Sequence, residues 1–300
     1  MGWQDRQEWS EQKKGRAVVI DWEAGEARVS HAREPWGKGG TDYVQVHSRL
    51  DELIGTVGRD AAVCAKLYER AKNHGDFRAA YELVVRRRSI HKLNALKEVV
   101  RKLRSPPLFV YPRVYNVDDT MADRPSNALP VMTARILRDY VGGEIWSSIK
   151  QITVKKRTKL DRLVRLLYQP KFRGYVLPRR GYILVDDVIS SGALFASLRS
   201  HIVSAGGIVV GMTALAHVSG RDQNLAITDE SLINLKAEFS EDIAGYWAKT
   251  FGHSIEMLTE QEARFLLGRW RHQNDQIESG SALLGRLRAT LSALAKAHTR

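Results

Sequence analysis

Apolar positions along the chain follow two kinds of pattern, and their order predicts an α/β core between helical regions. The run Ile183–Val185 is apolar throughout, which is typical of a strand buried on both faces of a parallel sheet. After a short polar stretch, apolar residues recur at helical spacing from Leu194 to Val203, and Gly206 marks the end of that helix. The same helical period fills 51–103 and 226–272.

Turn-forming residues divide the chain into three predicted parts. The N-terminal part, 1–105, combines a hairpin pattern over 17–30 with basic helices. The core, 106–220, is expected to place the short apolar strands 108–111 and 208–216 beside the central strand.

The remaining part, 221–300, is predicted to be helical. Within it, Leu258–Glu262 has the pattern of a capping box, in which Thr259 caps a helix and Glu262 reaches back. The spacing near the end of the chain suits either packing on its own domain or contact with a second copy or partner. The residues with this spacing are Leu284, Leu287, Leu291 and Leu294.

The central strand is followed directly by chemistry-bearing residues. Two acids, Asp186 and Asp187, come first, and the loop Ser190–Ala193 then leads into the helix. A helix start offers free amides and a positive dipole end to a phosphate, and Gly192 would let the backbone approach that anion closely. Because two carboxylates would repel a phosphate, they indicate a second ligand group, such as sugar hydroxyls or a metal. The alternative is an ordinary strand-to-helix turn with an acidic helix start.

This stretch resembles the phosphoribosyl-pyrophosphate (PRPP) motif of the type I phosphoribosyltransferases: an apolar strand, two acids, two apolar residues, a hydroxyl pair and glycine. The resemblance implies that the acids contact the ribose 2′ and 3′ hydroxyls and that the loop cradles the 5′-phosphate. It also implies that Mg²⁺ is held through PRPP rather than by direct protein ligands, with Asp186 and Asp187 as the candidates for any direct contact. One departure is that Ala193 and Leu194 stand where the family often has another hydroxyl residue. The implied PRPP-binding set is Asp186, Asp187, Val188, Ile189, Ser190, Ser191, Gly192, Ala193 and Leu194.

Two other segments correspond to functional loops of the same family. The loop after the first core strand carries pyrophosphate contacts there, which implies Arg113 here. A mobile basic loop closes over the substrate there, and residues 150–180 hold eleven basic residues against one acid. The resemblance implies that cations of this loop stabilise the leaving pyrophosphate, and that closure excludes water from the reacting sugar carbon. The cations expected to act are Lys155, Lys156 and Arg157. The alternatives are a surface arginine and a basic surface for nucleic-acid backbone.

A weaker similarity lies just before the predicted helix 128–140. Arg124 and Asn127 stand there as an arginine and an asparagine do in the competence-associated branch of the family. Together with the motif, these features predict an α/β fold: a parallel-sheet type I phosphoribosyltransferase core with added helical N- and C-terminal regions. The resemblance covers the core alone, which is under half of the chain.

Composition narrows the expected partners. The formal net charge of +13 favours an anionic partner, and a polyphosphorylated substrate, a nucleic acid and a membrane surface all fit this charge. Between 66 and 104, twelve basic residues stand against four acids, so nucleic-acid contact is a further hypothesis. Its tentative residues are Arg86, Arg87, Arg88 and Lys92.

Cysteine content and hydropathy bear on the compartment. The single cysteine, Cys64, excludes an internal disulfide, indicates a reducing compartment and is expected to be a core residue. No apolar run has the form of a signal peptide or a membrane span. We therefore expect a soluble cytoplasmic protein without a membrane partner.

The leading prediction is an enzyme that transfers a phosphoribosyl group from PRPP, with Mg²⁺, to an unidentified acceptor and releases pyrophosphate. A second hypothesis is a PRPP or nucleotide sensor that binds nucleic acid without catalysis, as purine-operon repressors keep this motif without transferase activity. A third is an effector of a bacterial defence system of the retron type, acting with a nucleoprotein partner. The missing hydroxyl after Gly192 and the basic helices fit the second hypothesis.

Overall fold

The structure, a computed structural model, describes residues 33–112, 127–151, 165–166, 169–239, 242–271, 284–285, 287–290 and 292–293. The predicted hairpin at 17–30 lies outside these residues. In the described chain, a six-stranded, mostly parallel sheet has the order β3-β2-β6-β7-β1-β8, and only β8 is antiparallel to its neighbour. The strands are β1 (Tyr43–Arg49), β2 (Leu108–Val110), β3 (Glu144–Ile145), β6 (Gly181–Val188), β7 (Ile208–His217) and β8 (Gln223–Asn224).

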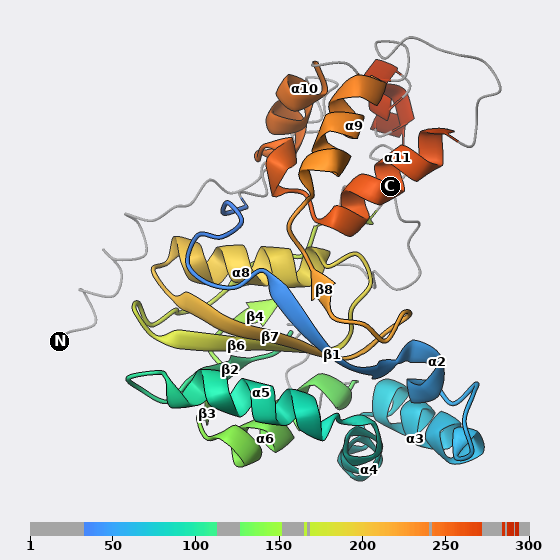
Figure 1. Ribbon diagram of the computed structural model, residues 1–300, viewed down its shortest axis with the longest axis vertical. Helices are drawn as coiled ribbons and strands as arrows, with labels where there is room; N and C mark the ends of the chain where they lie inside the picture. Colours follow the sequence, from blue (N-terminus) through green and yellow to red (C-terminus); the bar gives the residue numbers. More distant parts are fainter. Residues whose placement is uncertain are drawn as a thin grey trace.

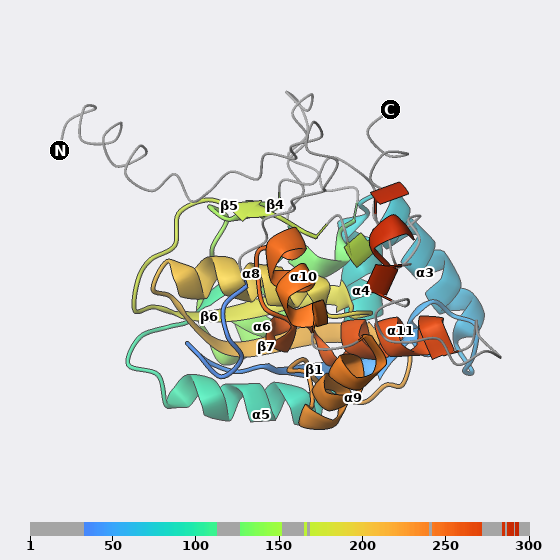
Figure 2. The ribbon, with the colours of Figure 1, turned by 90° about the horizontal axis from the view of Figure 1, so that it is seen from above.

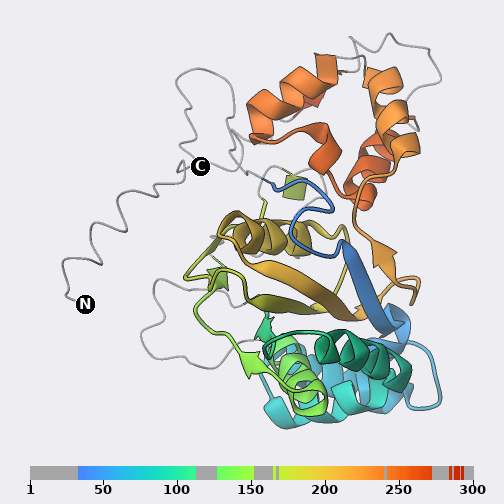
Figure 3. The same ribbon diagram turned by 60° about the vertical axis from the view of Figure 1, so that its left-hand side comes forward.

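Helices cover both faces of this sheet, so the molecule is an α/β structure in layers (Figure 1). One face packs on α8 (Ala193–Ser204), and the opposite face carries the helices of the N-terminal half together with α6 (Figure 3). Those helices are α2 (Leu50–Leu53), α3 (Ala61–Asn73), α4 (Phe77–Arg87), α5 (Ile90–Arg101) and α6 (Leu129–Val141). A separate two-stranded sheet pairs β4 (Lys150–Gln151) with β5 (Phe172–Arg173).

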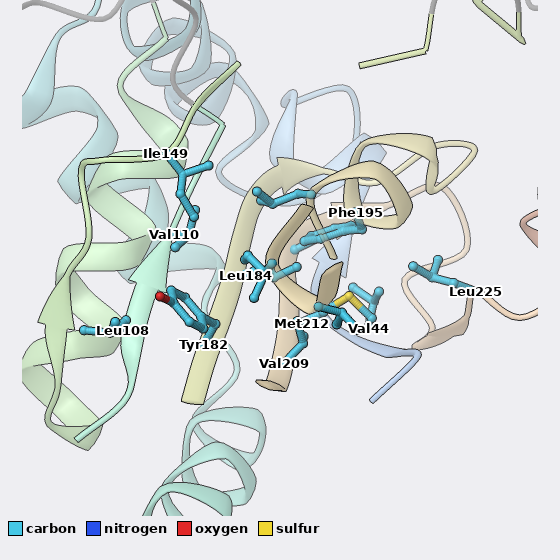
Figure 4. Packing of buried hydrophobic residues seen from close by; sticks show 14 of the residues in the cluster. Val44, Leu108, Val110, Ile149, Tyr182, Leu184, Phe195, Val209, Met212 and Leu225 are labelled. Atoms are coloured by element: carbon cyan, nitrogen blue, oxygen red, sulfur yellow. The ribbon is translucent and has the colours of Figure 1, made fainter. Parts of the chain in front are cut away.

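The central strand β6 is buried on both faces, as its continuous apolar run predicts. Tyr182 and Leu184 pack in the cluster beneath α8 (Figure 4), whereas Ile183 and Val185 pack against α5 and α6. Hydrogen-bonded neighbours flank β6 on both sides, β2 and β7, so no edge of this strand is exposed. The predicted strand and the helix that follows it are both confirmed.

Strand β1 corrects the predicted boundary at 105. The segment Tyr43–Arg49 was assigned to the N-terminal region, yet it pairs in parallel with β7 inside the main sheet. Its alternate residues Val44 and Val46 are fully buried in the cluster beneath α8. The core sheet therefore includes a strand that precedes residue 106. Parallel strands that lie side by side need a long connection, so β1 and its partner β7 are far apart in the sequence.

The C-terminal helices form a unit beyond α8 with a hydrophobic core of its own (Figures 1 and 2). It contains α9 (Asp229–Phe239), α10 (Asp242–Phe251), the short 3₁₀ helix Ile255–Met257 and α11 (Glu260–Arg271). Leu284 and Leu287 are buried in this core, so these two positions pack within the chain; Leu291 and Leu294 lie outside the described residues. Within the part of the chain that the structure describes, no helix combines the length and apolar character that a membrane crossing requires.

Candidate sugar-phosphate site

The acid pair lies at the C-terminal end of β6, where ligands bind in parallel α/β sheets. Both residues are nearly inaccessible to solvent, with Asp186 8% and Asp187 4% exposed. The amide of Asp187 donates to Oδ1 of Asp186 at 2.9 Å. Burial, followed by the charge of Asp187, raises the pKa of Asp186 well above its ordinary value. The arrangement therefore favours a proton on Asp186.

Two donors from other elements converge on Asp187. Lys72, in the last turn of α3, brings Nζ to 2.5 Å from Oδ2, and Asn127 donates from Nδ2 to the same oxygen at 3.2 Å. Burial lowers the pKa of Lys72, but the charge and hydrogen bond of Asp187 outweigh it, so the net pKa lies above its ordinary value. The ammonium group of Lys72 is therefore a counter-ion for the acid pair.

The loop after β6 has the geometry of an anion cradle. Gly192 has φ +76° and directly precedes α8, and a Cβ at that position would lie 2.7 Å from Cδ2 of Leu225. The left-handed backbone favours glycine here, and a larger residue would also require the side chain of Leu225 to shift. In the described part of the chain, the amides of Ser191, Gly192 and Leu194 donate to no acceptor. The helix that begins here has twelve residues, so its dipole adds a positive end at the loop.

The C-terminal unit supports this loop from behind. The hydroxyl of Thr259 donates to the carbonyl oxygen of Ser191 at 2.6 Å. Thr259 also forms the predicted capping box: its amide donates to Oε2 of Glu262 at 2.9 Å, and its hydroxyl accepts from the amide of Glu262 at 3.1 Å. The capping box is therefore confirmed, and one of its residues also fixes the backbone of the loop.

Several predicted residues lie outside the described residues. These are Arg113, Arg124, Lys155, Lys156 and Arg157. The structure does place the start of the segment that holds Arg113. Because β2 runs parallel to β6 and directly beside it, the chain leaves Val110 at the edge of the sheet where the acid pair lies.

The tentative nucleic-acid residues are not equally available. Arg87 donates to Oδ1 of Asp60 at 2.6 Å and to Sγ of Cys64 at 2.9 Å, and Lys92 is paired with Asp222. Arg86 is exposed and Arg88 is half-buried. Two of the four charges are thus engaged within the protein. Cys64 is buried, as predicted for a core residue.

Sequence reasoning missed Lys72 and Thr259 as parts of the site. Lys72 stood among the basic residues of 66–104, and only the fold shows that its helix packs beside the end of β6. Thr259 was recognised as a helix cap, but its contact with Ser191 spans 68 positions of sequence. Asn127 was noted by resemblance, and the structure brings it to Asp187.

Comparison with known proteins adds two relatives. The chain is 31% identical to "Protein TraN" of Escherichia coli over 237 residues, which is 78% of this chain and 48% of that protein. It is 30% identical over 137 residues to an uncharacterized protein of Haemophilus influenzae, covering 46% of this chain and 29% of that protein. No family model matches the chain. The chain therefore spans about half or less of the curated relatives that it matches.

Proposed function

We propose that this chain binds PRPP, accompanied by Mg²⁺, and transfers its phosphoribosyl group to an acceptor with release of pyrophosphate. The observation that carries this proposal is the adjacency of two opposite binding chemistries at one end of β6. Asp187 and Asp186 offer hydrogen-bonding oxygens. The loop offers amides that donate to no acceptor within the described residues, those of Ser191, Gly192 and Leu194. Ribose 5-phosphate suits both, because it carries hydroxyls and a phosphate on one small molecule.

Each half of the site then has a defined role. The amides and hydroxyls of Ser190–Ala193 hold the 5′-phosphate at the positive end of α8. The acid pair holds the ribose hydroxyls, and its charge does not repel the phosphate because Lys72 neutralises Asp187 and burial favours protonation of Asp186. This resolves the difficulty of placing two carboxylates beside a phosphate loop.

The reaction exchanges one bond at the ribose C1 carbon for another. The bond from C1 to the pyrophosphate oxygen breaks, the electron pair leaves with pyrophosphate, and a nucleophilic atom of the acceptor bonds to C1. When bound with PRPP, Mg²⁺ would supply neutralisation of the charge that develops on the leaving pyrophosphate. The assignment of Arg113 and of Lys155, Lys156 and Arg157 to that leaving group stays a prediction.

A PRPP sensor without transferase activity is a second candidate, favoured by one position. Ala193 is buried at the first turn of α8, where the family often has a hydroxyl residue. Phosphate binding would then depend on backbone amides and the two serines. Both candidates predict the same ligand and differ in turnover. The engagement of Arg87 and Lys92 in ion pairs weakens the case for a nucleic-acid surface at these residues.

Calorimetric titration with PRPP and Mg²⁺ tests the proposal. We expect the wild type to bind and Asp187→Asn to bind about ten- to a hundredfold more weakly, since a hydrogen bond to a charged group contributes about 1.5–3 kcal/mol. Asp139→Asn is a matched control, because the Asp139 side chain is 64% exposed on α6. Equal affinities for wild type and Asp187→Asn would refute the site. Pyrophosphate release in an acceptor screen would distinguish the enzyme from the sensor.

A further inference from the structure

Lys72 is held in place by the backbone as well as by its ion pair. The amide of Ala128 donates to the carbonyl oxygen of Ala71 at 2.9 Å, which fastens the last turn of α3 to the start of α6. Asn127 is fixed in turn, because its Oδ1 accepts from the amide of Leu129 at 3.1 Å. The two donors that reach Asp187 are therefore positioned by structure far from the motif itself.

The side chains of Lys72 and Asn127 would both oppose the binding of a metal ion at the acid pair. Carboxylate oxygens are the ligands that Mg²⁺ and Mn²⁺ prefer, so two adjacent buried acids would ordinarily attract such a cation. At Asp187, however, Oδ2 already accepts from the ammonium of Lys72 and from the amide of Asn127. A metal that used this oxygen would have to displace both donors, and a metal that used the other carboxylate oxygens of the pair would still lie close to the positive charge of Lys72.

A sugar hydroxyl meets no such obstacle. A hydroxyl both donates and accepts, so it can donate to a carboxylate oxygen while it accepts from Lys72 or Asn127. A metal ion can only accept lone pairs, and ammonium and amide N–H groups offer none. Lys72, Asn127 and Asp187 thus accommodate a sugar hydroxyl and disfavour a divalent metal ion. The site gains specificity because the competing ligand binds unfavourably.

We propose that Lys72 is a built-in counter-ion that excludes a divalent cation from Asp186 and Asp187 and reserves the pair for sugar hydroxyls. The inference rests on the proposed function, because it takes the acid pair as the sugar-binding half of that site. Mg²⁺ would then reach the protein on the polyphosphate end of PRPP, away from the carboxylates.

Binding of Mn²⁺ in the absence of any sugar phosphate tests this role, with the paramagnetic resonance signal of free Mn²⁺ as the readout. We expect wild type and Lys66→Gln to show no binding that depends on Asp187; Lys66 is exposed on the same helix and its loss changes the net charge equally. Lys72→Gln should gain one Mn²⁺ site that binds at least about tenfold more tightly, and Lys72→Gln/Asp187→Asn should lose it. Lys72→Arg keeps the charge and should behave as wild type.

Two results would overturn the inference: a wild type that already binds Mn²⁺ through Asp187, or Lys72→Gln that binds no better than Lys66→Gln. If Lys72→Gln does not fold, as judged by circular dichroism, Lys72→Met keeps the aliphatic stem and repeats the test. Titration of the same proteins with PRPP separates this inference from the proposed function. A gain of Mn²⁺ without PRPP binding by wild type would reject the function alone, and PRPP binding without that gain would reject the counter-ion role alone.

Discussion

Two ion pairs join distant parts of this chain, and they differ in how completely the protein surrounds them. Arg33 and Glu262 link the start of the described chain to α11, and their side chains are 2% and 1% exposed. Lys72 and Asp187 link α3 to the end of β6, and their side chains are 28% and 6% exposed. The first pair is sealed, whereas the cation of the second can be reached from solvent.

The sealed pair has a protein partner for each carboxylate oxygen. Arg33 donates to Oε2 of Glu262 at 2.6 Å and to Oε1 at 2.8 Å, and Gln169 adds a donor at 3.0 Å. Burial raises the pKa of Glu262, but Arg33 and the other donors outweigh it and hold the pKa at about 2. Both carboxylate oxygens of Glu262 are thus satisfied within the protein, and the pair fastens the C-terminal unit to the start of the described chain.

The partly open pair has a different consequence. Its donors both reach a single oxygen of Asp187, and the neighbouring carboxylate carries a raised pKa through burial and the charge of Asp187. Burial of charge that the protein does not fully compensate is unfavourable for folding and is typical of functional sites. The comparison predicts that changes at the sealed pair affect stability, whereas changes at the open pair affect binding.

The largest expected effect is on the sealed pair. Glu262→Ala leaves the guanidinium of Arg33 buried without its counter-ion, and we expect a loss of about 3–5 kcal/mol in the free energy of unfolding. Chemical denaturation measures this, with Glu82→Ala as control, because its pair with Arg78 is 40% and 87% exposed. The control should change stability by less than about 0.5 kcal/mol. Equal losses in the two variants would contradict the distinction.

Acidification should weaken the same pair in a defined window. The pKa of Glu262 is about 2 in the folded chain and 4.5 ordinarily, so its stabilisation is complete above 4.5 and is lost as pH falls towards 2. The loss is about 3 kcal/mol. Denaturation of wild type and Glu262→Gln at several pH values isolates this effect, because other carboxylates titrate in both proteins. We expect the difference in free energy of unfolding between the two proteins to shrink below pH 4.5. A difference that stays constant with pH would show that ionised Glu262 is not the source of this stabilisation.

At the open pair, one substitution should improve stability while it damages binding. Asp186 binds its proton more tightly when folded, so at pH 7 its ionisation opposes folding. Asp186→Asn should therefore raise the free energy of unfolding by on the order of 1 kcal/mol. The same variant should bind PRPP more weakly. Lower stability in thermal or chemical denaturation would indicate that Asp186 is structural.

The smallest expected effect is that of a substitution at Thr259, which joins the C-terminal unit to the loop after β6. Thr259→Val removes the hydroxyl that holds the carbonyl of Ser191, so PRPP affinity should fall several-fold and stability by about 1 kcal/mol. Thr228→Val is the matched control: its hydroxyl accepts from the amide of Ser231 at the start of α9 and does not contact the loop. It should lose similar stability without a change in affinity. If both variants bind alike, Thr259 acts on the helix alone.

Local pattern was enough to predict the strand β6, the following helix and the capping box at Thr259, because each depends on residues near in sequence. Strand β1 could not be placed in this way. Its alternating pattern over Tyr43–Arg49 is visible, but its position beside β7 depends on pairing over more than 160 residues. Lys72 was hidden for the same reason: a lysine on a basic helix is ordinarily solvated, and only tertiary packing brings it to Asp187.

The central claim is that the acid pair holds the sugar, and a ligand lacking one hydroxyl tests it most directly. Calorimetry would compare ribose 5-phosphate with 2-deoxyribose 5-phosphate, for wild type and for Asp186→Asn/Asp187→Asn. We predict that wild type prefers ribose 5-phosphate by about tenfold and that the variant binds both ligands equally, since the missing hydroxyl and the altered carboxyl groups belong to one interaction. A variant that keeps the wild-type preference would contradict the account.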